Sequence, residues 1–476
     1  MNKDLRSYLT DLVDAVPGDL LRVDTRVDRR FGITAHGAAA LRQGQQPAFY
    51  FTDVDGSSLA CVTNLLATHE RMALALGCPV EELTRSSATL QPQAAHPPVE
   101  VAAESAPVKQ VIRRDDEVRL SDLPIPVHNE LDGGPFLTAA MTVMRDPDSG
   151  QLNLGVYREQ VYDERLLGVW FFGSHHGGSI HRRYEERGEP TPVAIVIGHH
   201  PGMLMGAVSR VPGIGGEYDA AGAFLGEPVE LVRAETSDLL VPARAEIVIE
   251  GVIVPGEVRE EGPFAEWPGY YVGGGRKPVI RVDAITMRED AIFQDIQASG
   301  TEHRLMGALP RILSVRRNVG QAVPGLRAVN IPLHARMHCY LAIRKEQDND
   351  PVRAAFAALN TEPENLRMIV VVDDDIDVHD EQELSWAIGT RFDADRDLQV
   401  IPRWNGPGGL LPTNWAYDAD GDRTPRMSSA IIIDATKPAP PVRFPTRARV
   451  PEHAVRDVEL GQATTVKSAK DLPWHV

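Results

Sequence analysis

Two carboxylates lie five residues apart in the turn 261–266 (EGPFAE), and aromatic residues surround them. Four rings fall within residues 264–271, beginning at Phe264. Apolar rings raise the pKa of a nearby carboxylate, which is what a general acid working near neutral pH requires. An acidic surface turn is the plain alternative, but the density of rings favours a chemical role for Glu261 and Glu266.

A second polar segment, residues 153–158 (NLGVYR), falls on an expected strand. Because side chains alternate along a strand, Asn153, Gly155 and Tyr157 share one face, and Arg158 lies on the other face or at the strand end. By itself, this pattern is more typical of a turn asparagine followed by a surface arginine.

Two histidines and two glycines, residues 175–178 (HHGG), stand where a helix is expected to begin. Glycines there allow a phosphate to approach backbone N–H groups, and a histidine can either ligate a metal or cap the helix. The residues alone leave these roles open. The pair His199-His200 is more typical of a turn. The sequence contains no Gly-x-Ser-x-Gly elbow and no phosphate-binding Gly-x-x-x-x-Gly-Lys-Ser/Thr loop.

The chain has 476 residues, a length that predicts two or three domains to position these segments. Residues 1–107 form a small α/β unit and a proline-rich linker, residues 108–310 are rich in strands, and residues 311–476 alternate helices and strands as a separate α/β domain. Expected strands are 20–23, 47–51, 137–144, 152–157, 193–197, 229–232, 246–253, 278–285 and 368–372, and expected helices are 5–13, 68–76, 177–187, 353–359 and 383–388.

An acidic run, Asp373-Asp374-Asp375, follows one of the expected buried strands. It could form a second metal site. The stronger interpretation is a strand end that leads into a helix N-terminus, where carboxylates are favoured.

The net charge of −18 and the pI of about 5.3 argue against binding to nucleic acid or to an anionic membrane. No stretch approaches about 18 apolar residues, so no membrane helix is expected. Residues 1–14 carry charges and no apolar core, unlike a signal peptide. Cys61, Cys78 and Cys339 have no metal-ligand spacing, which favours reduced thiols in a cytoplasmic protein.

Taken together, the segments resemble the UbiD family of decarboxylases. The similarity runs from about Asp115 to about Ala435 and rests on the strings NLGVYR, GEYDAAG, ARAEIVIEG and EGPFAEWPGYY in this order. The residues resemble the aromatic-acid and furan-acid branches of this family more than a bare family consensus would. The resemblance implies an α+β fold: a split β-barrel cofactor-binding domain, a small N-terminal α/β unit and a C-terminal α/β dimerisation domain.

The resemblance also implies prenylated FMN and a divalent metal, Mn²⁺ or Mg²⁺. Asn153, His175 and Glu217 match the metal ligands, although one extra residue before His175 leaves the choice between His175 and His176 open. A K⁺ ion is implied near residues 207–211. The positions that match cofactor contacts are Val156, Tyr157, Arg158, Phe171, Phe172, Gly173, His176 and Gly177.

Arg158, Glu261 and Glu266 match the catalytic set of the family, with Glu266 as the proton donor. An aromatic, heteroaromatic or α,β-unsaturated acid would lose carbon dioxide through a covalent adduct with prenylated FMN, because side chains alone offer no electron sink for the carbanion. The implied partners are a flavin prenyltransferase that supplies the cofactor and further copies of the chain, as a homodimer or larger assembly. His334 is a candidate substrate-side residue. A flavin-dependent oxidoreductase on a similar barrel and a silent assembly subunit are the alternatives.

Overall fold

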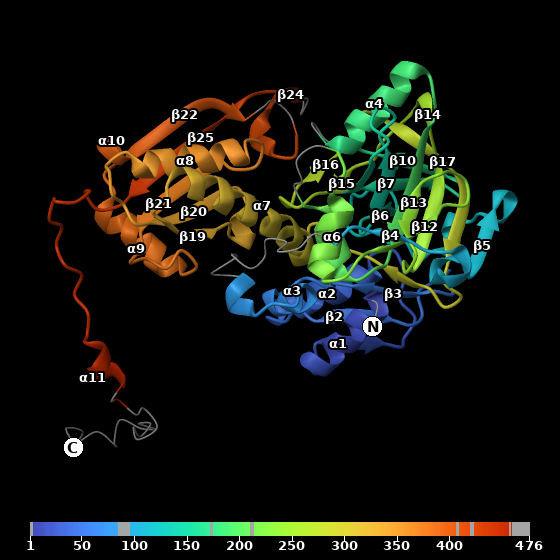
Figure 1. The fold of residues 1–476 in the computed structure, drawn as a ribbon, viewed down its shortest axis with the longest axis horizontal. Helices are drawn as coiled ribbons and strands as arrows, with labels where there is room; N and C mark the ends of the chain where they lie inside the picture. Colours follow the sequence, from blue (N-terminus) through green and yellow to red (C-terminus); the bar gives the residue numbers. More distant parts are fainter. Residues whose placement is uncertain are drawn as a thin grey trace.

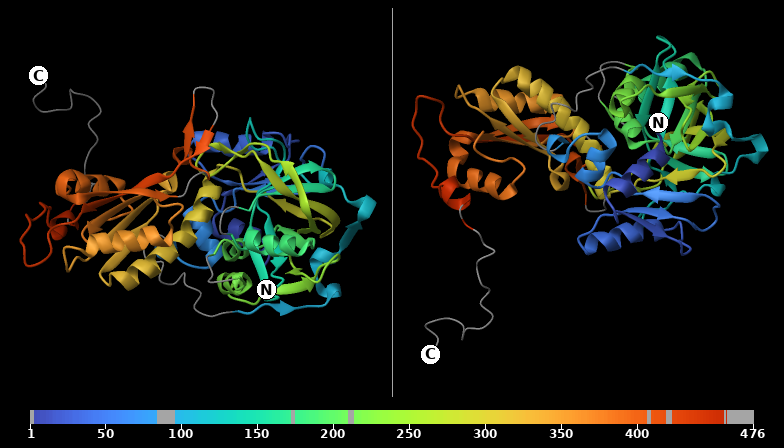
Figure 2. Two further views of the ribbon diagram at one scale, coloured as in Figure 1. Left: turned by 90° about the horizontal axis from the view of Figure 1, so that it is seen from above. Right: turned by 60° about the horizontal axis from the view of Figure 1, so that its bottom comes forward.

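A computed structural model describes residues 3–83, 96–171, 175–209, 214–405, 409–418, 423–456 and 458. Figures 1 and 2 show an N-terminal unit in blue packed beneath a strand-rich middle part in teal and green. A C-terminal part, in gold to red, stands beside these two, and helix α7 lies between it and the middle part. None of the described helices is long and apolar enough to cross a bilayer.

The N-terminal unit is a small sheet flanked by helices. Its strand order is β1-β2-β3-β18, so β18, Ile292–Gln294, joins it from the far end of the middle part. Apolar side chains at Leu5, Tyr8 and Leu12 bury one face of the first helix, whereas Val13, the next residue, is 51% exposed. The remaining bounds are α1 Leu5–Ala15, β1 Leu20–Val23, α2 Gly32–Arg42, β2 Ala48–Phe51, β3 Ala60–Thr63 and α3 His69–Leu76.

The middle part is built on a curled, nine-stranded sheet of order β6-β9-β10-β17-β14-β11-β7-β8, with β5 paired to β17. Both faces are apolar: along β11, Ala194 and Val196 pack toward the helices, while Val193 and Ile195 pack inside the curl. The strands are β5 Val111–Arg114, β6 Phe136–Leu137, β7 Met141–Arg145, β8 Leu152–Val156, β9 Glu159–Asp163, β10 Leu166–Val169, β11 Thr191–Ile197, β14 Ile247–Glu260 and β17 Arg276–Met287.

Three helices and two small sheets complete the middle part. Helix α4 begins at His176, the second histidine of the expected pair, and α6 begins at Glu217 itself, so both bring candidate site residues to helix N-termini. The bounds are α4 His176–Arg187, α5 Pro201–Ala207, α6 Glu217–Leu225, β4 Val99–Glu100, β12 Glu230–Arg233, β13 Leu240–Pro242, β15 Phe264–Ala265 and β16 Tyr271–Val272.

The C-terminal part is a five-stranded sheet of order β19-β20-β21-β25-β22 with helices on both faces. Alternate residues of β21 face opposite sides: Ile369 and Val371 pack with α7 and α8, whereas Val370 and Val372 pack with α9. The bounds are α7 Thr301–Ala322, β19 Leu326–Asn330, β20 His338–Ile343, α8 Asp350–Thr361, β21 Met368–Asp373, α9 Glu381–Arg391, α10 Ala394–Asp397, β22 Leu398–Asn405, β23 Trp415–Tyr417, β24 Arg423–Pro425, β25 Ser428–Ala435 and α11 Glu452–Arg456.

Three elements differ from the sequence expectation. The domain switch expected near residue 310 falls inside α7, which continues through Pro310. Strand β14 extends past its expected end because Pro255 and Gly256 are accommodated where the register with β17 shifts. Leu137 belongs to a separate strand, β6, which pairs with β9 and not with the hairpin.

Candidate active site

A cavity of about 650 Å³ lies between the curled sheet and the C-terminal part. Residues of β8, the start of α6 and the turn before β16 line it on one side, and α7 together with Arg336 lines the other. Eight of the predicted site residues line this cavity: Asn153, Val156, Tyr157, Arg158, His175, His176, Glu217 and Glu266. The helix α7, which the sequence did not reveal, is therefore one wall of the candidate site.

Arg158 joins the two carboxylates of the turn into one network. Its Nε and one terminal nitrogen donate to both oxygens of Glu261, each at 2.9 Å, and the other terminal nitrogen donates to Glu266 Oε1 at 2.6 Å. All three side chains are buried, and the guanidinium carbon lies 4.0 Å from the centre of the Trp170 ring. The paired bonds to Glu261, the single bond to Glu266 and the Trp170 ring thus hold the guanidinium in one orientation.

The turn that carries both carboxylates is fixed by its neighbours. Asp132 accepts from the backbone N–H of Ala265 at 2.9 Å, and Gln160 accepts from the backbone N–H of Gly262 at 2.8 Å. Gly133 and Gly262 meet backbone to backbone, so a Cβ on either glycine would collide with the other. This close approach explains why the motif needs a glycine directly after Glu261.

The electrostatics of Glu266 differ from the expectation. Burial would raise the pKa of this carboxyl, but His303 and Arg158 outweigh burial and hold the pKa below its ordinary value. His303 Nε2 lies 3.9 Å from Glu266 Oε2. The expected effect of the surrounding rings is therefore overturned by a salt bridge that the ring pattern did not predict.

Asn153 and Glu217 form a second polar group on the cavity wall. Asn153 Nδ2 donates to Glu217 Oε1 at 3.0 Å, and His176 Nδ1 lies 3.4 Å from the same oxygen. The His175 ring instead packs 5.8 Å from the ring of Tyr157. Both histidines line the cavity, so the choice between them stays open. Burial raises the pKa of Glu217.

Tyr157 organises the predicted cofactor contacts around it. Its hydroxyl accepts from the backbone N–H of Gly177 at 3.1 Å, and a Cβ at Gly155 or Gly177 would press into the ring or hydroxyl. Phe171 packs edge-on at 5.0 Å. Phe172 and Gly173 lie outside the described residues, as do the last two positions of the 207–211 segment. Ala207, Val208 and Ser209 line the cavity.

Models of one protein family match most of this chain. The N-terminal, Rift-related and C-terminal domains of the 3-octaprenyl-4-hydroxybenzoate carboxy-lyase family, UbiD, match residues 15–90, 99–301 and 304–408 in turn. The chain belongs to the UbiD family. Because its relatives along nearly their whole length are named decarboxylases, the chain is a carboxy-lyase.

Two curated UbiD relatives and two solved structures show the extent of the similarity. The chain is 32% identical to anhydromevalonate phosphate decarboxylase of Methanothermobacter thermautotrophicus, over 89% of this chain and 98% of that protein. It is 30% identical to phenolic acid decarboxylase of Sedimentibacter hydroxybenzoicus, over 94% of each. An evolved dimeric form of the UbiD-class enzyme HmfF from Pelotomaculum thermopropionicum, in complex with prFMN, superposes with a TM-score of 0.84 at 32% identity, covering 96% of this chain and 99% of that one. HmfF in complex with FMN gives 0.85 at 34% identity, with the same coverage.

Several cavity residues of this UbiD chain have no signal in the local motifs. His303, Arg311 and Arg336 come from α7 and the segment before β20, well beyond the barrel strings in sequence. Their types alone, a helical histidine and two arginines, are typical of many surfaces. Only the packing of α7 against the barrel reveals that they line the same cavity as Glu266.

His334 lies outside this cavity. Its side chain is 61% exposed, and its Nε2 pairs with Glu381 Oε1 at 2.8 Å. It does not belong to the described residues that line the site. The structure thus favours the surface alternative for His334, and Arg336, two residues later, is the cavity residue of this segment.

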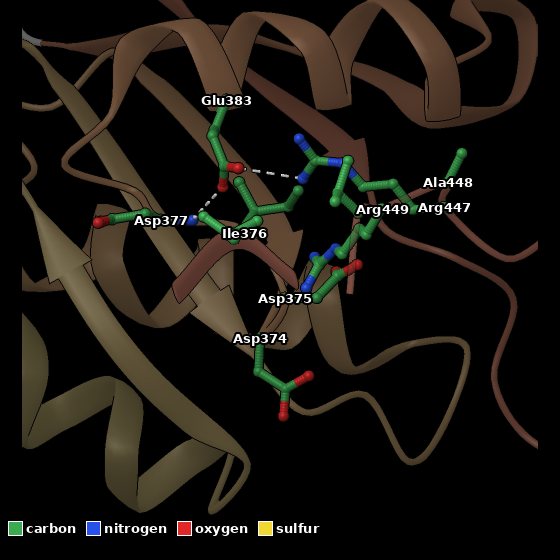
Figure 3. Close-up of a pocket in the computed structure, with 10 residues that line it drawn as sticks. Asp374, Asp375, Ile376, Asp377, Glu383, Arg447, Ala448 and Arg449 are labelled. Carbon is green, nitrogen blue, oxygen red and sulfur yellow. Dashed lines mark hydrogen bonds and ion pairs between the residues drawn. The ribbon is translucent and has the colours of Figure 1, made fainter. Parts of the chain in front are cut away.

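Arginine and lysine side chains form ion pairs with the acidic run after β21. Arg391 pairs with Asp373 at 2.7 Å and with Asp375 at 2.9 Å, and Lys437 pairs with Asp375 at 2.9 Å. Figure 3 shows the adjoining hollow, in which Glu383 bonds to Arg447 and Asp374 points away from Glu383. The ion pairs of Asp373 and Asp375 favour the interpretation of the run as a strand end, and the described residues contain no metal-binding cluster of three or more His, Cys, Asp or Glu side chains.

Proposed function

We propose that this chain removes carbon dioxide from an aromatic, heteroaromatic or α,β-unsaturated acid with prenylated FMN as cofactor. The observation that carries the proposal is the buried Arg158 shared between Glu261 and Glu266 on the wall of a 650 Å³ cavity. Carboxylate substrates need such a cation in a protein of net charge −18. The relatives are named as decarboxylases of a phenolic acid and of an unsaturated acid phosphate, which supports the same class.

Prenylated FMN supplies the electron sink that stabilises the carbanion left by carbon dioxide. Val156, Tyr157 and His176 line the cavity where it would bind, and Tyr157 is held rigidly by Gly177. HmfF is solved with both prFMN and FMN, which supports a flavin here. The split-barrel description and the division at residues 107 and 310 belong to this proposal.

A divalent cation fits the Asn153 and Glu217 group. Asn153 Oδ1 and Glu217 Oε2 are buried without a hydrogen-bond partner, and buried oxygens of this kind suit coordination of a cation. No cluster of three or more His, Cys, Asp or Glu side chains in metal-binding geometry occurs among the described residues. The set therefore depends on an amide oxygen, a carboxylate and one imidazole, from His175 or His176. This mixed set suits Mn²⁺ or Mg²⁺, and K⁺ would bind near Ala207.

Arg158 and Glu266 perform the proton chemistry in this proposal. Arg158 orients the substrate carboxylate, and that carboxylate competes with Glu266 for the guanidinium. Losing part of this contact raises the pKa of Glu266, so that the carboxylate takes up a proton from solvent and then gives it to the carbon that lost carbon dioxide. Glu261 keeps the other fork of Arg158 and so preserves its orientation.

The oxidoreductase alternative has no observation in its favour, because the relatives are named decarboxylases. The proposal includes a separate flavin prenyltransferase as cofactor supplier, a homodimer or larger assembly and a cytoplasmic location. One neighbour is a dimeric form, which supports self-association.

The test is carbon dioxide release from a panel of unsaturated and aromatic acids. The chain is produced with and without a flavin prenyltransferase, and both preparations are assayed side by side. We expect release only from the co-produced protein. Full activity from purified protein loaded with plain FMN would contradict the cofactor assignment, and consumption of a nicotinamide would favour the oxidoreductase.

A further inference from the structure

Arg336 is a buried cation on the cavity wall opposite the barrel. The residue is 5% exposed, and its guanidinium carbon lies 4.4 Å from the centre of the Trp267 ring. One terminal nitrogen donates to the backbone carbonyl of His303 at 3.3 Å. The packing is built for it, because a Cβ at Gly307 would collide with the guanidinium.

Arg336 makes no direct ion pair among the described residues, unlike its neighbours, and Glu266 and Glu362 act on it only from a longer distance. Arg158 binds two carboxylates, and Arg311 Nε bonds to Glu362 at 3.1 Å. Within the described part of the chain, no carboxylate forms an ion pair with Arg336, and its Nε is buried without a hydrogen-bond partner. Burying an unpaired charge costs several kcal/mol, so a site of this kind is completed by an anion.

The position of Arg336 identifies that anion as part of the substrate. Trp267 follows Glu266 directly, and His303 contacts the same carboxylate at 3.9 Å. Arg336 therefore lies at the proton-donor end of the cavity. The cofactor phosphate would bind at the other group, beside Asn153 and Glu217, where the unpartnered ligand oxygens are.

We propose that Arg336 binds a second anionic group of the substrate, so that the acid decarboxylated here is a dianion. The first carboxylate meets Arg158 and leaves as carbon dioxide, while a carboxylate or phosphate at the far end of the molecule stays bound to Arg336. The planar guanidinium matches the two oxygens of either group. This inference rests on the proposed function and narrows its substrate class.

The test compares three probes that differ at one end: cinnamate, 4-carboxycinnamate and the methyl ester of the second carboxyl. Binding to holoenzyme is measured by calorimetry, with 4-phosphonocinnamate as a fourth probe to separate carboxylate from phosphate-like recognition. Hydrogen bonds to charged groups contribute about 1.5–3 kcal/mol, so the dianion should bind about 10- to 100-fold more tightly than the neutral ester. Arg336→Gln should abolish this preference, and Arg336→Lys should keep part of it.

Arg317→Gln is the matched control, because Arg317 is an exposed arginine on the same cavity. It should leave the preference within about threefold of wild type, since exposed charges contribute little. Equal affinity of wild type for the diacid and its ester would overturn the inference, as would a preference that survives Arg336→Gln or disappears equally in Arg317→Gln. Carbon dioxide release is followed separately. A preference without release from any acid would refute the proposed function alone, whereas release without a preference would refute only the role of Arg336.

Discussion

Most of the hydrogen-bond donors of Arg158 are already bonded to protein carboxylates. Three of its N–H groups already bond to Glu261 and Glu266, all in a buried setting. A substrate carboxylate that uses the terminal nitrogen bonded to Glu266 competes with that bond. The contact to Glu266 is a single bond, whereas Glu261 is held by two, so Glu266 is the partner that yields. This asymmetry gives the two carboxylates different roles although both touch the same arginine.

Replacing Glu266 by glutamine tests this division of roles. The amide keeps the shape of the side chain but cannot carry a proton, so we expect carbon dioxide release to fall by about 100-fold or more. Exchange of solvent deuterium into the product, measured by NMR, should stop as well. Flavin and metal content should stay at the wild-type level.

Two further variants serve as comparisons for Glu266→Gln. Glu261→Gln should impair both reactions together and less severely, because its role is to orient Arg158. Glu217→Ala should lose flavin and metal, measured by absorbance and elemental analysis, since its buried, unpartnered oxygen is the proposed metal ligand. Deuterium exchange at the wild-type rate in Glu266→Gln would assign the proton to another group.

Sequence reasoning found one side of this site and missed the other for a physical reason. Asn153, Arg158 and Glu266 lie in short strings whose strand and turn geometry is local. Arg336 and His303 contribute through the packing of a distant helix, and no local pattern encodes that contact. The lowered pKa of Glu266 was missed for the same reason, because it depends on His303 and Arg158 and not on the rings nearby.

At the scale of elements, the strongest periodic segments were predicted well and the proline-containing ones were not. Strand β1 and helix α3 end within a residue of the prediction, and α3 stops at Gly77 in the left-handed conformation. Helix α7 was missed because Pro310 removes a backbone donor within it. The neighbouring turns of α7 pack against Val329 and Leu341, and this burial outweighs the cost of the proline.

The curl of the large sheet depends on Gly251, where the pairing of β14 with β17 shifts register. A Cβ there would collide with the backbone carbonyl of Arg281, which cannot move without opening the sheet. We expect Gly251→Ala to lower the free energy of unfolding by about 1–3 kcal/mol. Urea denaturation followed by circular dichroism measures it.

Gly389 provides the opposite case. It lies inside α9, and a Cβ there would meet no atom within 4 Å. Gly389→Ala should therefore raise stability by about 0.5–1 kcal/mol, because alanine loses less backbone entropy in a helix. If Gly389→Ala also lowered the free energy of unfolding, the loss in Gly251→Ala could not be assigned to the collision in the sheet.

At the scale of the whole molecule, ion pairs between buried and partly buried side chains join the N-terminal unit to the barrel. Arg288 pairs with Asp4 at 2.9 Å, and Arg6 pairs with Glu246 at 3.0 Å. Beside them, His200 packs edge-on against Tyr8 at 5.5 Å and accepts from the backbone N–H of Gly202 at 3.1 Å. Both His199 and His200 are buried and act as hydrogen-bond acceptors, so protonation would disrupt the joint between the two units.

This joint should make the molecule sensitive to acid. Burial lowers the pKa of His199 to about 4 and that of His200 to about 3, from an ordinary value of 6.5. Between these values the unfolded chain binds more protons than the folded one, so stability is complete above about pH 6.5 and falls as the pH drops toward 4. For His199 alone the loss approaches roughly 3 kcal/mol below its folded pKa.

The comparison of variants isolates this effect from other buried groups. Burial raises the pKa of Glu159 and of Glu302 to about 8, and these carboxyls make stability fall as the pH rises, the opposite sign. Melting temperatures are therefore measured from pH 7 to pH 4 for wild type, His200→Asn and the exposed-site control His453→Asn. Asparagine keeps an acceptor for Gly202 but does not titrate, so His200→Asn should flatten the acid limb of the curve while His453→Asn leaves it unchanged. If His200→Asn and wild type lose stability in parallel, the joint around α1 and α5 is not what acid breaks.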